Sequence, residues 1–304
     1  MIKAIVSLLI ATSILTASCS KDDFTEDTTA ASGSTLTNVS YASTSSAQKM
    51  DIYLPEGTGP FPIVVLIHGG AFMMGDKSGE ASNAAALVAK GIAAASINYR
   101  LSGEAKYPAQ IQDCKAAVRF LRANATKYNL NPDKIGSWGA SAGGNLSSLL
   151  GTTSGVSELE GESLGNSSYS SKVIASVDWF GPINFLTMDA EAAALGFIIT
   201  TNSSASPESK LIGAAVQTVP AQVAKANPAT YITSDDAAFF IQAGSLDRNI
   251  PYTQSLNFYN SLKTTLGDNK VTYELISGAG HGGAQFITTS NMSKVIAFFD
   301  KYLK

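Results

Sequence analysis

The chain has 304 residues, 45% of them hydrophobic, and a formal net charge of −3. This length suits one large domain with a substantial core, and the slightly acidic balance excludes the basic surface that nucleic-acid binding requires. Of the two cysteines, Cys19 ends an apolar N-terminal run, so the domain cannot rely on a disulfide and Cys114 is expected to be a small core residue.

The N-terminus predicts an export signal. A short charged head is followed by an apolar run over residues 4–15, which is shorter than the ~20 residues of a membrane-spanning helix. The run ends in the sequence LTASC, which resembles a bacterial lipobox, and its last residue, Cys19, would then be acylated. We therefore expect a lipoprotein-type signal peptide over residues 1–19, with an ordinary signal peptide cut near Ala17 as the alternative.

Residues 20–35 are rich in serine, threonine and alanine and predict a disordered tether. Together with a lipid on Cys19, this tether would hold the domain of residues 36–304 at a membrane. The expected localisation is that of an exported, outer-membrane lipoprotein, facing the periplasm or the cell surface. The run Lys21-Asp22-Asp23 also resembles the export tags of some surface-displayed lipoproteins. The sequence leaves the oligomeric state open.

The pattern from residue 36 onwards predicts an α/β fold with a mainly parallel sheet covered by helices on both faces. Residues 36–54 alternate loosely, which indicates two antiparallel opening strands. Ile63–Ile67 is a continuous apolar run, typical of a strand buried on both faces. Later strands are expected at 92–99, 135–138, 172–180, 238–243 and 271–276, and helices at about 82–90, about 108–128, after 141, at 252–266 and up to about 302.

Two segments, residues 151–171 and 183–206, are less regular than the rest of the domain. We expect both to lie above the carboxyl ends of the strands, where ligand sites form in α/β sheets. They would act there as small lids and substrate loops, and 151–171 would supply a polar rim because serine, glycine and glutamate dominate it.

The pattern Gly-x-Ser-x-Gly occurs at Ser141 and again at Ser163. Ser141 follows the apolar residues 135–138 and precedes a small-residue helix pattern, which is the strand, sharp turn and helix of a nucleophile elbow. The flanking glycines leave room where strand and helix nearly collide, and the strained turn exposes the serine hydroxyl. Ser163 lies in a polar stretch without these neighbours. Ser141 is therefore the candidate nucleophile.

A serine nucleophile needs a base and an acid that orients the base, and folds with this elbow place them in the order serine, acid, histidine. Of the two histidines, only His281 follows Ser141, and it lies in a glycine-rich loop after a predicted strand. Asp247 lies just past the end of another predicted strand and is the preferred acid. Asp178 lies inside a strand; it is the alternative acid, or a residue that braces the site.

The sequence His68-Gly69-Gly70-Ala71 follows the first buried strand, where the loop that binds an oxyanion is expected. Backbone N–H groups of Gly70 and Ala71, with that of Ala142 after the nucleophile, would point at the substrate oxygen. His68 would then brace this loop rather than act as a second base.

Several segments together carry a family resemblance that runs from about Met50 to the C-terminus. The domain resembles esterases of the α/β-hydrolase superfamily close to the hormone-sensitive-lipase group, and within it the bifunctional acetylxylan esterase and feruloyl esterase subfamily. The resemblance implies a triad of Ser141, Asp247 and His281 and no metal or organic cofactor. At Ala71 lipase-like relatives have a third glycine, a change that keeps the backbone donor. The segments are HGGAFMMGDKS, INYRL, YPAQIQDCKAAVRFLRANA, KIGSWGASAGG, DWFGPINF, ANPATYI, GSLDRNIPY and GAGHGG.

The resemblance implies a serine carboxylic ester hydrolase that removes acetyl or feruloyl groups from plant polysaccharides through an acyl-enzyme. Residues 151–171 would then form a sugar-facing rim of the site. The alternatives are a general short-chain carboxylesterase or lipase-like enzyme, a peptidase related to the prolyl-oligopeptidase group, and an inactive surface binding protein. The expected partners are a small-molecule or polysaccharide ester and, through the lipid anchor, a membrane.

Overall fold

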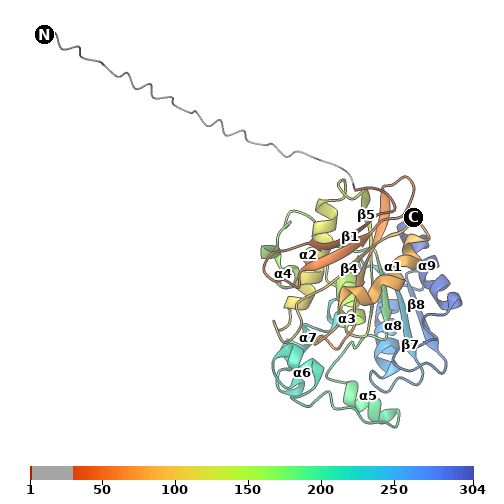
Figure 1. Cartoon of the computed structure of the whole chain (residues 1–304). Coiled ribbons are helices and arrows are strands. Elements are labelled where there is room, and N and C mark those ends of the chain that lie inside the picture. Colours follow the sequence, from red (N-terminus) through yellow and green to blue (C-terminus); the bar gives the residue numbers. More distant parts are fainter. Residues whose placement is uncertain (2–29) are drawn as a thin grey trace.

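The computed structural model describes Met1 and residues 30–304, and in these residues eight strands form one sheet in the order β1-β2-β4-β3-β5-β6-β7-β8 (Figure 1). Strand β2 pairs antiparallel with both of its neighbours, β1 and β4, and all later pairings are parallel. The strands are β1 (Thr35–Ser40), β2 (Lys49–Tyr53), β3 (Phe61–Ile67), β4 (Ala93–Ile97), β5 (Leu130–Ala140), β6 (Ala175–Trp179), β7 (Ala238–Gly244) and β8 (Val271–Ile276). This confirms the predicted fold class.

Helices cover both faces of the sheet, as the residues of β3 show. Ile63, Val65 and Ile67 belong to one apolar core, together with residues of α2, α3 and α8. Val64 and Leu66 point the other way, into a second core with residues of α1 and α9. Because successive strand residues face opposite sides, a strand buried on both must be apolar throughout. The helices are α1 (Ala81–Val88), α2 (Ala109–Ala123), α3 (Ala142–Thr152), α4 (Ser157–Glu160), α5 (Met188–Ala194), α6 (Pro207–Ile212), α7 (Pro220–Ala224), α8 (Tyr252–Leu266) and α9 (Thr289–Leu303).

The helix predicted over about 108–128 is shorter in the structure. Helix α2 ends at Ala123, and Asn129 has a φ of 53°, which a helix does not allow. The N–H of Phe61 then bonds to the carbonyl of Asn129, and Leu130 pairs with β3, so that β5 begins earlier than predicted. Pairing with β3 therefore decides where this helix ends.

The predicted signal peptide, Cys19 and most of the predicted tether lie outside the described residues. The last residues of that tether contact the domain: Ala30 N–H donates to the Lys127 carbonyl at 2.7 Å, and Gly33 N–H donates to the Pro55 carbonyl at 2.9 Å. Strand β1 begins at Thr35, one residue before the predicted start of the domain. Among the described residues, no helix combines the length and the apolar character that a membrane crossing requires.

Residues 151–171 do not lie where we predicted. Helix α3 carries the chain from the carboxyl end of β5 back across the sheet, so this segment precedes the amino end of β6. The Gly151 carbonyl accepts from the N–H of Ala237, directly before β7 begins, which places the segment at the amino edge of the sheet. Residues 151–171 therefore cannot form a rim of the site at the carboxyl edge of the sheet. The prediction was wrong because the helix that follows the elbow reverses the direction of the chain.

A buried ion cluster fixes this segment to α2. Glu160 lies 2.6 Å from the Lys115 ammonium and 3.3 Å from the Arg119 guanidinium, and both cations are almost fully buried. Lys115 also donates to the Thr153 carbonyl. Burying two cations is costly unless an anion and hydrogen bonds compensate them, and Glu160 provides that anion.

We predict that Glu160→Ala lowers the free energy of unfolding by about 3–5 kcal/mol, because it leaves two buried cations without their counter-ion. Urea denaturation followed by circular dichroism measures this. Glu162→Ala, at an exposed neighbour, is the matched control and should stay within about 0.5 kcal/mol of the parent. Equal unfolding midpoints for the two variants would show that the cluster contributes no net stability.

Candidate active site

The turn between β5 and α3 holds Ser141 in a strained conformation. Its φ is 56° and its ψ is −121°, and its N–H donates to the Trp179 carbonyl at the end of β6. A side chain at Gly143 would put a Cβ 2.0 Å from the Ile67 carbonyl oxygen, and one at Gly139 would lie 2.1 Å from the Gly143 carbonyl oxygen. Both positions of the motif therefore require glycine because backbones approach too closely for any other residue.

The structure brings together the three residues predicted as a triad. Ser141 Oγ lies 2.9 Å from His281 Nε2, and His281 Nδ1 lies 2.7 Å from Asp247 Oδ2. The other oxygen of the Asp247 carboxylate accepts from the N–H groups of Asn249 and Ile250. Because a carboxylate only accepts hydrogen bonds, Nδ1 carries the imidazole proton, and Nε2 is free to accept the proton of the serine hydroxyl.

A phenylalanine that sequence reasoning missed packs against the His281 ring. Phe180 meets the imidazole edge to face at 4.8 Å between ring centroids, and Phe286 packs on Phe180 in turn. Phe180 has a φ of 45°, and its N–H donates to the Gln242 carbonyl of β7. The apolar residues after β6 give no sequence signal for this role, because the contact depends on where the distant His281 loop folds back.

Asp178, the alternative acid, does not reach His281. Its carboxylate is fully buried and accepts from the Gly181 N–H at 2.8 Å and the Ser148 hydroxyl at 3.0 Å. Burial raises the pKa of the Asp178 carboxyl to about 6. The residue ties the chain after β6 to α3, which is the bracing role that the sequence left open. Ser163 is exposed in a short 3₁₀ turn at the opposite edge of the sheet.

The loop after β3 has the geometry expected of an oxyanion loop. Gly70, Ala71 and Phe72 all have positive φ, at 108°, 55° and 58°. Within residues 30–304, the N–H groups of Gly70, Ala71 and Ala142 have no hydrogen-bond partner, so they can bind a substrate oxygen. Whether they do so stays a prediction.

His68 braces this loop, and within residues 30–304 its ring makes no hydrogen bond to Ser141, Asp247 or His281. Its ring stacks on Tyr99 at 4.4 Å between centroids, and Nδ1 lies 2.7 Å from the Gly69 carbonyl oxygen. Burial lowers the pKa of His68, which keeps the imidazole neutral. The Tyr99 hydroxyl donates to the His68 carbonyl, so that the loop is fixed on both sides.

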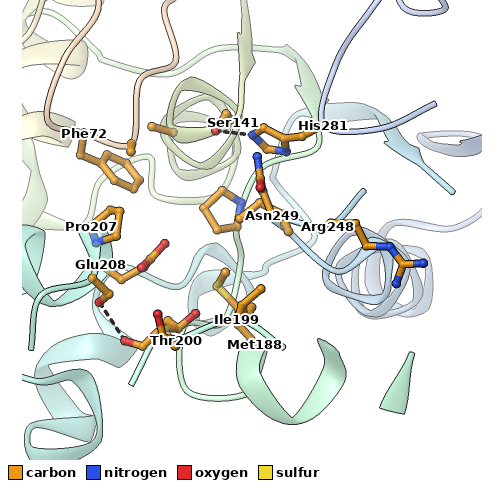
Figure 2. Close-up of a pocket in the computed structure, with 16 residues that line it drawn as sticks. Phe72, Ser141, Met188, Ile199, Thr200, Pro207, Glu208, Arg248, Asn249 and His281 are labelled. Carbon is orange, nitrogen blue, oxygen red and sulfur yellow. Dashed lines mark hydrogen bonds between the residues drawn. The ribbon is translucent and has the colours of Figure 1, made fainter. Parts of the chain in front are cut away.

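Ser141 and His281 open onto a pocket of about 420 Å³ (Figure 2). The predicted lid, residues 183–206, supplies part of its wall, and the segment after Asp247 supplies another part. Among residues 30–304, no group of three or more histidine, cysteine, aspartate or glutamate side chains could hold a metal ion. The lining residues are Ala71, Phe72, Ser141, Ala142, Pro182, Met188, Ile199, Thr200, Thr201, Ser206, Pro207, Glu208, Arg248, Asn249, Ile250 and His281.

The model of the family described as BD-FAE matches residues 50–262 of the chain, which hold the elbow, the oxyanion loop and Asp247. The chain belongs to the BD-FAE family. This confirms the predicted relation to acetylxylan and feruloyl esterases of the α/β-hydrolase superfamily, and with it the enzyme class, a serine esterase. The matched residues end before His281, which the structure nevertheless places beside Ser141.

Solved structures and curated proteins support the BD-FAE assignment. A "truncated form of carbohydrate esterase from gut microbiota" is 35% identical, with a TM-score of 0.80, over 91% of this chain and 97% of that one. A bifunctional GH43-CE protein of Bacteroides eggerthii is 38% identical, also with a TM-score of 0.80, over 90% of this chain and 36% of that one. Esterase LipC of Mycobacterium tuberculosis is 27% identical over 78% of this chain and 57% of its own length. The chain thus spans little more than half of this curated relative.

We predict that Asp247→Asn lowers kcat by about 10³–10⁴, because the amide stabilises the wrong tautomer of His281. The same substitution of the triad aspartate has this effect in serine proteases. Asp178→Asn should cost far less, since the buried carboxyl only braces a loop. Initial rates on 4-nitrophenyl acetate measure both variants, and circular dichroism shows that they fold. The reverse ranking would move the acid to Asp178.

Proposed function

We propose that this BD-FAE protein is a carbohydrate esterase that removes acetyl or feruloyl groups from plant polysaccharides through an acyl-enzyme. The observation that carries this proposal is the continuous row of hydrogen bonds from Asp247 through His281 to Ser141, at the wall of a pocket. The family and the similarity to a carbohydrate esterase along nearly its whole length support the substrate class.

In the first half of the reaction, Ser141 Oγ attacks the carbonyl carbon of the ester while His281 Nε2 takes the hydroxyl proton. The carbonyl oxygen becomes negative and is stabilised by the N–H groups of Gly70, Ala71 and Ala142. The tetrahedral intermediate then breaks its bond to the sugar oxygen, and the imidazolium protonates that oxygen. The sugar hydroxyl leaves, and the acyl group remains on Ser141.

In the second half, water replaces the sugar. His281 takes a proton from the water as its oxygen attacks the acyl carbon, and the same N–H groups stabilise the second oxyanion. The bond to Ser141 Oγ breaks, the serine regains its proton from the imidazolium, and the free acid leaves. Asp247 stays deprotonated throughout and keeps the imidazole oriented toward Ser141.

The pocket suits a sugar with a small acyl group. Its volume of about 420 Å³ lies at the lower end of the range for small-molecule sites, about 300–1,000 Å³. Apolar side chains such as Phe72 and Ile250 share the wall with the hydroxyls of Thr200 and Thr201. A mixed wall of this kind matches a sugar ring, which has apolar faces and polar edges.

We predict acetate release from acetylated xylan or its oligosaccharides, with rates on aryl esters that fall steeply beyond about eight acyl carbons, because added methylenes find no apolar pocket. Chromatography of released acid and a chain-length series of 4-nitrophenyl esters measure this, with Ser141→Ala as the blank. A series that peaks at long chains, with no acetate from xylan, would favour the lipase-like alternative. Good turnover of short esters alone would favour a general carboxylesterase.

We further propose that Cys19 is lipidated and that the protein is exported to the outer membrane. The support is the sequence LTASC at the end of an apolar run. Cys19→Ala should convert a membrane-associated protein into a soluble exported one with the same specific activity. Cell fractionation and immunoblotting measure this, and a parent protein that is fully soluble would contradict the proposal.

A further inference from the structure

A glutamate that no step of the mechanism uses lines the active-site pocket. Glu208 is the second residue of α6, and Figure 2 shows it beside Pro207, on the side of the pocket opposite Arg248. Its residue surface is only 8% exposed, so the carboxylate has little contact with bulk water. It lines the same cavity as Ser141, and a substrate held at the serine therefore lies within the space that Glu208 faces.

No cation compensates this carboxylate. Among residues 30–304, no lysine, arginine or histidine forms an ion pair with Glu208. The guanidinium of Arg248, which also lines the pocket, lies instead over the ring of Phe197 at 4.8 Å. The neighbouring charge is another acid, Asp189, whose carboxylate accepts from the N–H groups of Thr201 and Asn202.

The hydroxyl nearest in sequence also has a second acceptor. Ser206 donates its single proton to the Thr201 carbonyl at 2.8 Å. Burial raises the pKa of the Glu208 carboxyl, the residue's own N–H and then the Ser206 hydroxyl oppose this in part, and Asp189 adds to the rise. A buried carboxylate without a full set of hydrogen-bond donors lowers the stability of the fold, and a leucine or glutamine at this position would lower it less. A donor brought by a molecule in the pocket would lower this cost, because the carboxylate lines the pocket wall.

We propose that Glu208 is a specificity-determining residue whose carboxylate accepts a hydrogen bond from a hydroxyl group of the substrate. The neighbouring Asp189 disfavours an anionic ligand here, and the proposed substrates carry hydroxyl groups as their hydrogen-bond donors. This inference rests on the proposed function, which offers two sources of such a hydroxyl: the sugar on the alcohol side of the ester, or the phenol of a feruloyl group on the acyl side.

Two matched substrate pairs distinguish the sources. The first compares acetylated xylo-oligosaccharides with 4-nitrophenyl acetate, which has the same acyl group and no sugar. The second compares methyl ferulate with methyl 3,4-dimethoxycinnamate, in which the phenol is blocked. For each pair the ratio of kcat/KM for the hydroxyl-bearing ester to that for its partner is measured in the full-length protein.

Glu208→Leu should lower this ratio by about 10- to 100-fold in one of the pairs, the range expected for a lost hydrogen bond to a charged group. The pair that responds identifies the source. Glu208→Gln keeps one acceptor oxygen without the charge and should fall between the parent and Glu208→Leu. Glu104→Leu, at an exposed turn outside the pocket, is the control and should leave both ratios at the parent value.

Failure of the inference and failure of the proposed function give different results. If the parent protein cleaves the hydroxyl-bearing esters and both Glu208 variants keep its ratios, the inference is overturned and the function stands. If the parent cleaves 4-nitrophenyl acetate but neither hydroxyl-bearing ester, both are overturned. Because each ratio uses a second substrate of the same variant, partial unfolding cancels, and thermal unfolding midpoints confirm that the variants fold.

Discussion

The site depends on one close approach between backbones. Helix α3 starts directly after Ser141, and its first turn lies so near the end of β3 that a Cβ on Gly143 would meet the Ile67 carbonyl oxygen at 2.0 Å. This contact sets the oxyanion loop, which continues from β3, beside the nucleophile, which ends β5. In the same turn Ser141 has a φ of 56°, a strained conformation that accompanies the sharp change from strand to helix.

The candidate active site and the buried ion cluster lie at opposite edges of the sheet. At the carboxyl edge, loops after β3, β5, β7 and β8 supply the oxyanion loop, Ser141, Asp247 and His281. At the amino edge, the ion cluster around Glu160 closes the returning chain onto α2. The ion cluster and the triad are therefore built from different residues at opposite edges of the sheet.

Most of the fold and the core of the site could be predicted from the sequence, because their signals are local. Apolar runs mark the buried strands, and the elbow glycines mark the turn that Ser141 needs. The chain has two histidines, and His281 was the only candidate base because it alone follows Ser141. Asp247 was preferred over Asp178 by its place after a strand, and the hydrogen bonds of the two carboxylates agree with that choice. Local chemistry and chain order were sufficient here.

What could not be predicted depends on long-range folding. Residues 151–171 were placed at the wrong edge, because composition does not say in which direction a helix carries the chain. Phe180 and Glu208 gained their surroundings from segments far away in the sequence, so nothing beside them in the chain marks their place. The end of α2 likewise followed from strand pairing rather than from helix propensity.

The described domain begins far from the pocket. Ala30 is hydrogen-bonded to Lys127, in the turn that leads into the amino end of β5, whereas the pocket opens at the carboxyl ends of the strands, near α5 and α6 (Figure 1). Ala30, where the described domain begins, therefore lies at the edge of the sheet opposite the pocket. If the protein is held at a membrane from its N-terminal side, as proposed for Cys19, the pocket lies at the edge of the domain away from that attachment, and a bulky polymer could approach Ser141 without passing between the protein and the membrane.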